Sequence, residues 1–163
     1  MRNRESTRRA IWLLAVCLAL AGCDESSSPP PVPLASSPVT SPAATLFFCT
    51  VSDPQCRTSV NSFEGDTIRD LFVLVAWQGL EGQHTVVVEF ILPDGNLYQR
   101  LEVPFDTSTA PTSQGEPVLV VALPVAGTFI TQHSLYGTWG VGVFLGGSAV
   151  SSANFVLLPP SAP

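Results

Sequence analysis

The sequence predicts an all-β domain, built as an antiparallel sandwich of about seven strands. Between Leu46 and Leu158, short runs rich in β-branched and aromatic residues alternate with turn residues about every ten positions. Hydrophobic residues make up 45% of the chain and charged residues only 12%, so there is enough apolar surface for a packed core. No part of this region shows a helical repeat, and about 100 residues is the usual size of one sandwich.

Short turns join the expected strands. Gly79–Gly82 permits a chain reversal, Pro93–Asn96 contains an Asp-Gly turn, and Gly146-Gly147 closes a tight hairpin. Such short links make successive strands antiparallel neighbours. The expected strands lie near Leu46–Val51, Thr67–Trp77, His84–Leu92, Leu97–Val103, Val118–Leu123, Thr138–Leu145 and Ala149–Leu158.

Alternating apolar residues show which strand faces are buried. In the strands His84–Leu92 and Thr138–Leu145 every second residue is apolar, and we expect these two faces to meet inside the domain. The faces consist of Val86, Val88, Phe90 and Leu92, and of Trp139, Val141, Val143 and Leu145.

The strand Thr67–Trp77 is apolar on both faces. This pattern is expected of a central strand, and equally of a strand that carries an exposed interaction patch, so the sequence leaves both readings open. The two sets are Leu71, Val73, Val75 and Trp77 on one face, and Phe72, Leu74 and Ala76 on the other.

The first 22 residues have the composition of an export signal. Four arginines precede the apolar run Ala10–Ala21, as in the positive and hydrophobic regions of a signal peptide. The run has about 12 residues, whereas a membrane-spanning helix needs about 20, so we expect cleavage. Thr7–Trp12 resembles a loose twin-arginine motif, although a domain without a cofactor gains nothing from folding before export, which favours the Sec route.

The segment Leu20-Ala21-Gly22-Cys23 resembles the lipobox of bacterial lipoproteins. The resemblance implies cleavage after Gly22, a diacylglycerol group on the Cys23 thiol and usually a further acyl group on its amine; the alternative is a free thiol behind a secretory signal. Two or more acyl chains give stable anchoring. Asp24 resembles the enterobacterial signal for retention on the periplasmic face of the inner membrane; otherwise the outer membrane or cell surface is expected.

The domain boundaries follow from composition. Residues 1–22 form the signal peptide, and 23–45 hold the lipidated cysteine and a Ser/Pro-rich linker. In polyproline II conformation this disordered linker would hold the domain up to about 70 Å from the bilayer; a Pro-rich ligand for a partner domain is the alternative reading. The sandwich occupies 46–158, and 159–163 form a C-terminal tail.

Several segments of the sandwich resemble immunoglobulin-like and fibronectin type III-like modules of bacterial exported proteins. They are Phe63–Ile68, Gly82–Val86, Pro93–Gly95, Gly137–Val141 and Asn154–Leu157. The resemblance implies an immunoglobulin-like sandwich and says almost nothing about function, because this fold serves many activities.

Two cysteines, Cys49 and Cys56, remain in the mature domain once Cys23 is lipidated. An even pair in an exported protein indicates a disulfide bond, which would stabilise the domain by about 2–3 kcal/mol. The pair is too close in sequence for the inter-sheet bridge of antibody domains. A metal pair or redox-active dithiol would need further ligands or a Cys-x-x-Cys spacing, which the sequence lacks.

Trp77, Tyr98 and Trp139 are the candidate ligand-binding residues. Lined up on an exposed sheet, such aromatic side chains form a platform for sugar rings, whereas tryptophan in a sandwich more often belongs to the core. His84 and His133 each stand alone, without the spacing of a metal motif.

Acidic turn residues form two groups that would bind calcium only if their carboxylates converged in space. The groups are Glu64, Asp66 and Asp70, and Asp94 and Asp106. We expect ordinary solvated carboxylates, and therefore no metal site and no cofactor.

The sequence thus predicts a membrane-anchored, non-enzymatic module that binds a protein of the envelope or surface. A carbohydrate-binding module, with a glycan as partner, is the alternative, and an envelope hydrolase or isomerase ranks third, because no nucleophile elbow or dinucleotide motif is present. Nucleic acid is excluded as a partner: the chain has no lysine, and the mature part has twelve acidic residues against Arg57, Arg69 and Arg100.

Cys23→Ser is expected to abolish incorporation of a labelled fatty acid such as palmitate, because the thiol is the diacylglycerol acceptor. Metabolic labelling followed by immunoprecipitation measures the incorporation. Cys17→Ser, which changes a thiol within the expected signal peptide, is the control. Equal labelling of wild type and Cys23→Ser would contradict the lipobox prediction.

Overall fold

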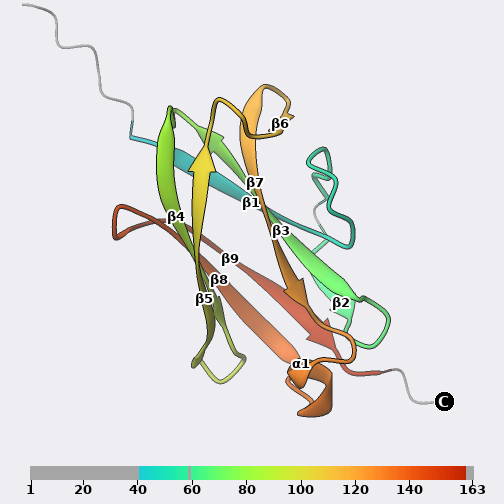
Figure 1. Cartoon of the computed structure of the whole chain (residues 1–163). Helices are drawn as coiled ribbons and strands as arrows, with labels where there is room; N and C mark the ends of the chain where they lie inside the picture. The colour runs from blue at the N-terminus through green and yellow to red at the C-terminus, as the bar shows by residue number, and fades with distance from the viewer. Residues whose placement is uncertain (1–40, 59, 161–163) are drawn as a thin grey trace, which may run out of the picture. The chain divides into compact units, whose positions relative to one another are not determined.

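The computed structural model describes residues 41–58 and 60–160, which form two packed β-sheets (Figure 1). The first sheet has the order β1-β3-β7-β6, and the second has the order β2-β9-β8-β4-β5. The strands are β1 (Ala43–Cys49), β2 (Ser62–Glu64), β3 (Asp70–Gln78), β4 (Gln83–Ile91), β5 (Leu97–Asp106), β6 (Thr112–Ser113), β7 (Glu116–Pro124), β8 (Gly137–Leu145) and β9 (Ser148–Leu158).

This strand order is that of an immunoglobulin-like sandwich. In their order across the sheets, β1, β3, β7 and β6 take the places of strands A, B, E and D, while β9, β8, β4 and β5 take those of G, F, C and C′. The predicted fold class is therefore confirmed, and each of the seven expected strands is present. β1 begins at Ala43, so its first three residues fall within the stretch assigned to the linker.

Three short elements were not predicted. β2 and β6 have three and two residues, too few to show a period of two. The expectation that no helix is present is wrong at α1 (Phe129–Gln132), a single turn on which only Ile130 is buried. The Thr128 hydroxyl caps this turn by accepting a hydrogen bond from the Ile130 amide.

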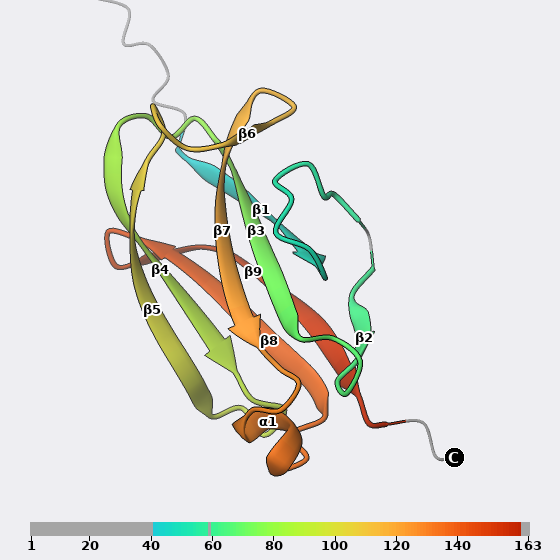
Figure 2. The ribbon, with the colours of Figure 1, turned by 45° about the vertical axis from the view of Figure 1, so that its right-hand side comes forward.

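The first part of the chain enters both sheets, as Figure 2 shows. β1 pairs antiparallel with β3, and after the segment between them β2 pairs with β9. The β2–β9 pair is parallel, so the expectation of antiparallel neighbours is wrong here. The reason is that β2 and β9 come from opposite ends of the domain, and no hairpin turn sets their direction.

The predicted inner faces of β4 and β8 both lie in the core, but they do not face each other. Val88 pairs with Val143 within one sheet, so the two faces are neighbours on the same side. They pack against the fully buried Leu71, Val73 and Val75 of β3 in the opposite sheet. Gly95 and Gly147 adopt positive φ, as the predicted turns require.

Two tryptophans anchor the core. Trp139 stacks on Phe155 with ring centroids 5.9 Å apart, and its indole Nε1 donates a hydrogen bond of 2.9 Å to the carbonyl oxygen of Leu135. Trp77 packs near Phe105, at 6.4 Å between ring centroids. The buried Nε1 of Trp77 has no hydrogen-bond partner among the described residues.

The two tryptophans differ in a way that unfolding measurements can detect. Trp139→Phe and Trp77→Phe both remove part of a buried ring, but only Trp139→Phe also removes a hydrogen bond. We expect Trp139→Phe to lower the free energy of unfolding by about 1 kcal/mol more than Trp77→Phe. Urea denaturation of the purified protein measures both values, and a larger loss for Trp77→Phe would contradict the hydrogen bond from Trp139 to Leu135.

Candidate functional site

The outer face of the β1-β3-β7-β6 sheet carries a second apolar cluster, separate from the main core. Leu74 and Ala76 of β3 and Val118 of β7 are at most 2% exposed there. The segment that follows β1 and contains Cys56 and Arg57 covers them, and we call it the covering segment. Cys56 packs against this outer cluster and forms the predicted disulfide with Cys49. The disulfide prediction is confirmed.

Arg57 fastens this covering segment to the β6–β7 hairpin. Its Nε donates a hydrogen bond to Ser113 Oγ (2.9 Å), and its Nη2 donates to Ser113 O (2.8 Å) and to Glu116 Oε2 (2.7 Å). The guanidinium also lies 5.1 Å from the centre of the Phe47 ring. Hydrogen bonds from Arg57, and then from Gln78, hold the pKa of the Glu116 carboxyl below its usual value.

These contacts decide between the two readings of the strand with two apolar faces. β3 is a central strand, with β1 and β7 on either side. Its outer face is covered by the chain's own disulfide-bonded segment, so Leu74 and Ala76 do not form an exposed interaction patch.

The three predicted ligand-binding aromatics do not form an exposed platform. Trp77 and Trp139 are core residues, at most 1% exposed. Tyr98 is half-buried and packs edge-on against Trp139, with ring centroids 5.1 Å apart. The two tryptophans therefore follow the core alternative and not the ligand platform, because the alternation that places them on strands also turns them inward. Cys23, the predicted lipidation site, lies outside the described residues.

The candidate metal ligands are also dispersed. Within residues 41–58 and 60–160 no group of three or more His, Cys, Asp or Glu side chains is placed to hold a metal ion. Asp94 lies in the β4–β5 turn and Asp106 at the far end of β5. His133 stacks on Phe129, with ring centroids 3.9 Å apart.

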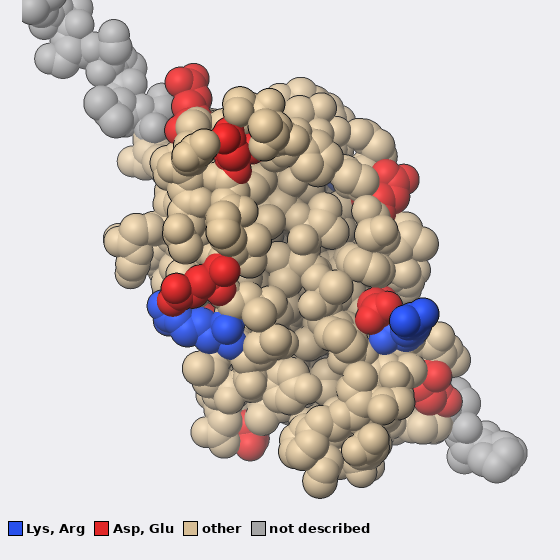
Figure 3. Space-filling view, in the orientation of Figure 1, with Lys and Arg blue, Asp and Glu red and all other residues tan. Residues whose placement is uncertain are grey.

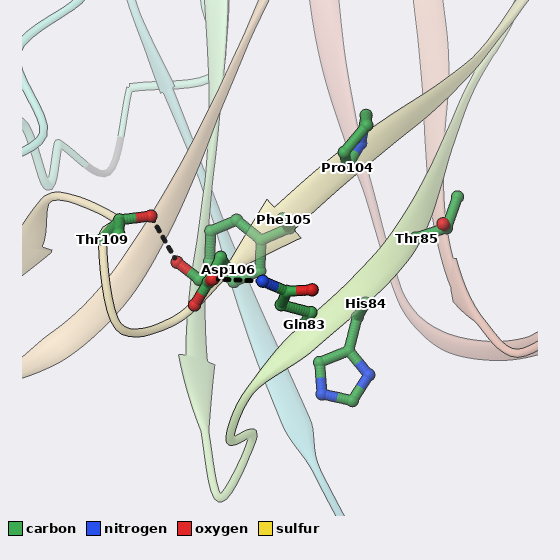
Figure 4. A pocket seen from close by; sticks show the side chains of 7 residues that line it. All are labelled: Gln83, His84, Thr85, Pro104, Phe105, Asp106 and Thr109. Atoms are coloured by element: carbon green, nitrogen blue, oxygen red, sulfur yellow. Dashed lines mark hydrogen bonds between the residues drawn. The ribbon is translucent and has the colours of Figure 1, made fainter.

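A cleft of about 540 Å³ lies at the open end of the β4–β5 hairpin, away from its turn (Figure 4). Asp106 accepts hydrogen bonds from Gln83 and from the hydroxyl and amide of Ser108, and these bonds lower the pKa of its carboxyl, the Ser108 hydroxyl having the largest effect. The His84 ring lies 2.8 Å from the Glu81 carbonyl oxygen. Each polar group is thus engaged locally, and the cleft holds no paired acid and base.

A longer surface with few charged side chains follows the side of the sandwich where both sheets end. We call it the β5–β7 margin, and it consists of the open edges of β5 and β7 and the grooves between them. One groove, of about 590 Å³, is lined by Tyr98, Gln99, Leu123, Pro124, Thr128 and Phe129. A second, of about 300 Å³, is lined by Pro104–Asp106, Thr109–Pro111 and Val118–Val120.

Exposed apolar groups gather at the α1 end of this margin. Phe129 is 54% exposed, and the half-buried Tyr98 lies in the same groove as Phe129. Further along β5, Leu101 and Val103 are only partly buried although they pack on the core. No sequence pattern marked this margin, because β5 and β7 belong to different sheets and the alternation along a strand does not show which edges lie side by side.

Charged side chains lie around this face and not in its middle (Figure 3). The described residues contain ten acidic residues and three arginines. Each arginine has an acidic partner: Arg57 pairs with Glu116, Arg100 with Glu89, and Arg69 with Asp70. The net charge of the domain is therefore negative, and no arginine in the described ranges is left unpaired.

Comparison with known proteins found similar solved structures but no matching family. No protein-family model and no curated protein sequence matches the chain. Similar solved structures include an immunoglobulin-like protein from Pseudomonas aeruginosa (17% identity, TM-score 0.42), covering 73% of this chain and 93% of that one. Another is the CARDB domain of a Pyrococcus furiosus protein in complex with di-metal ions (13%, 0.39), covering 72% and 93%.

A DNA glycosylase from Pseudomonas fluorescens, bound to DNA with an abasic-site analogue, is also similar (11% identity, TM-score 0.40), covering 71% of this chain and 30% of that one. At such identities the likenesses say nothing about activity or ligands. Within the described residues, no helix is long and apolar enough to cross a membrane.

The Arg57–Glu116 contact makes stability depend on pH. Because the pKa of folded Glu116 lies below its ordinary value of 4.5, its ionised form stabilises the fold above that value, and this contribution is lost as pH falls through the folded pKa. Glu116→Gln should therefore lower the melting temperature at pH 7, and the difference should shrink toward pH 3. Thermal unfolding across this range measures it, with Glu81→Gln as control. A difference that is constant with pH would contradict the contact.

Proposed function

We propose that this protein is an exported, lipid-anchored module whose sandwich binds another protein of the cell envelope without catalysing a reaction. The observation that carries the proposal is the β5–β7 margin, where exposed Phe129 and half-buried Tyr98 line an uncharged groove. Centres of protein interfaces are depleted of charged residues and enriched in aromatic ones.

The rest of the surface supports the choice of this margin. The outer face of β3 is already covered by the disulfide-bonded segment. The outer face of the other sheet carries the ion pairs that Arg100 makes with Glu89 and Glu102. The two grooves of the margin combine apolar exposure with only one charged side chain, that of Asp106.

The proposed anchor fits a binding function physically. Lipidation at Cys23 would confine the domain to a membrane surface, either the periplasmic face of the inner membrane or the outer membrane or cell surface. Confinement raises the effective concentration of the domain near neighbouring membrane proteins, so a modest intrinsic affinity suffices. A Ser/Pro-rich linker would give the domain reach.

A glycan is the competing partner, and burial of Trp77 and Trp139 removes the sequence observation that pointed to it. The described residues offer no replacement platform of exposed aromatic rings on a sheet. Binding on a glycan array is therefore an outcome that counts against the proposal.

Site-specific photo-crosslinking in intact cells tests the proposal. A photoreactive residue at Gln99, in the margin, should give a discrete protein adduct, because Gln99 lines the groove beside Phe129. The same residue at Ser152, an exposed position on β9, is the control and should give none. No adduct from Gln99, together with specific binding of the purified domain on a glycan array, would overturn the proposal.

A further inference from the structure

We propose that β7 is a docking edge, to which an extended, largely apolar and non-acidic segment of the partner adds as a further strand. This inference rests on the proposed protein-binding function and names the edge and the chemistry that the partner would use. It follows from the ladder of β7, the protection of the other edges and the charge of the domain.

The edge of β7 is open over most of its length. On one side Val118–Pro124 pairs with β3, but on the other side β6 pairs only with Glu116 and Pro117. Figure 1 shows β6 beside one end of β7. The Val118 amide donates to the Pro111 carbonyl, away from β3. Because backbone groups alternate along a strand, the amides and carbonyls of Val120 and Ala122 point to the same open side.

The other long edges are protected along their length, whereas in β7 proline and charge are confined to the two ends, at Glu116, Pro117 and Pro124. Natural sheets guard their edges with proline, charge or a covering segment. β5 has Pro104, which has no amide hydrogen, and the charged Arg100 and Glu102. The Thr107 amide donates a hydrogen bond to the Gly82 carbonyl oxygen, on the β4 side. Because backbone groups alternate along a strand, those of even-numbered residues, including Pro104, face the open side.

The β1 and β9 edges are partly occupied by the segment that leads to β2. The Thr58 hydroxyl donates to the Phe48 carbonyl, and the Val156 amide donates to the Asn61 carbonyl. By contrast Val118–Leu123 contains neither proline nor a charged residue. Such a run, open on one side, is a template for strand addition.

An added strand would also cover apolar surface that is now partly exposed. Its side chains would alternate between the two faces of the sheet. Those turned inward would lie over Leu101 and Val103 of β5, which are only partly buried. The grooves at the two ends of the margin would receive the side chains at the ends of the segment.

The negative charge of the domain indicates which kind of segment can add to the edge of β7. A second copy would bring the same excess of ten acidic residues over three paired arginines, and would be repelled. The chain's own linker has six prolines among residues 24–45, which lack the amide hydrogens that a ladder needs. A partner segment without acidic side chains, and with a cationic residue near Asp106 in the groove beside Val118, is complementary.

The test uses the full chain in cells and the Gln99 crosslinker. Ala122→Pro removes an amide hydrogen that makes no bond to β3, so the domain keeps its own ladder, while Ala122→Ser keeps the amide and is the matched control. We expect Ala122→Pro to reduce the adduct at least tenfold and Ala122→Ser to leave it unchanged. An undiminished adduct in Ala122→Pro would overturn strand addition but leave the protein-binding function standing.

A second measurement does not depend on the folding of the proline variant. A photoreactive residue at Ala122, whose side chain is exposed, should give the same adduct as one at Gln99. Absence of an adduct from Ala122, while Gln99 still gives one, would overturn the docking edge. Absence from both positions in otherwise wild-type protein would instead count against the proposed function itself.

Discussion

The rest of the structure depends on the burial of β3 on both faces. Leu71, Val73 and Val75 on one side and Leu74 and Ala76 on the other are all at most 1% exposed. One sandwich interface covers only one face of a strand, so the outer face needs a second cover. That cover is the segment held by the Cys49–Cys56 bond and by Arg57.

This requirement shapes the route of the chain. After β1 the chain crosses the outer face, closes the disulfide, reaches the β6–β7 hairpin through Arg57, and only then joins the second sheet as β2. One of the three arginines in the described domain makes this contact. The chain thus covers the outer face of the first sheet, but it leaves the edge of β7 open beyond the two residues that pair with β6.

The sequence predicted what local pattern determines. The seven longer strands, the turns with Gly95 and Gly147 and the disulfide follow from periodicity, turn chemistry and cysteine count. It did not distinguish a covered patch from an exposed one on β3, because Arg57 and Ser113 meet across 56 residues of sequence. The β5–β7 margin was missed because alternation along a strand does not show which strands of two sheets end side by side. Trp77 and Trp139 show that strand aromatics alone do not indicate a surface.

Amide hydrogen exchange on the folded domain tests the central claim, that β3 is covered on both faces and paired on both sides, whereas one edge of β7 is exposed to solvent. The account predicts that the amides of Val73, Leu74 and Val75 exchange only through global unfolding, whereas those of Val120 and Ala122 exchange by direct access from solvent. Fast exchange at Leu74 under native conditions, or protection of Val120 and Ala122 equal to that of β3 in the isolated domain, would contradict it.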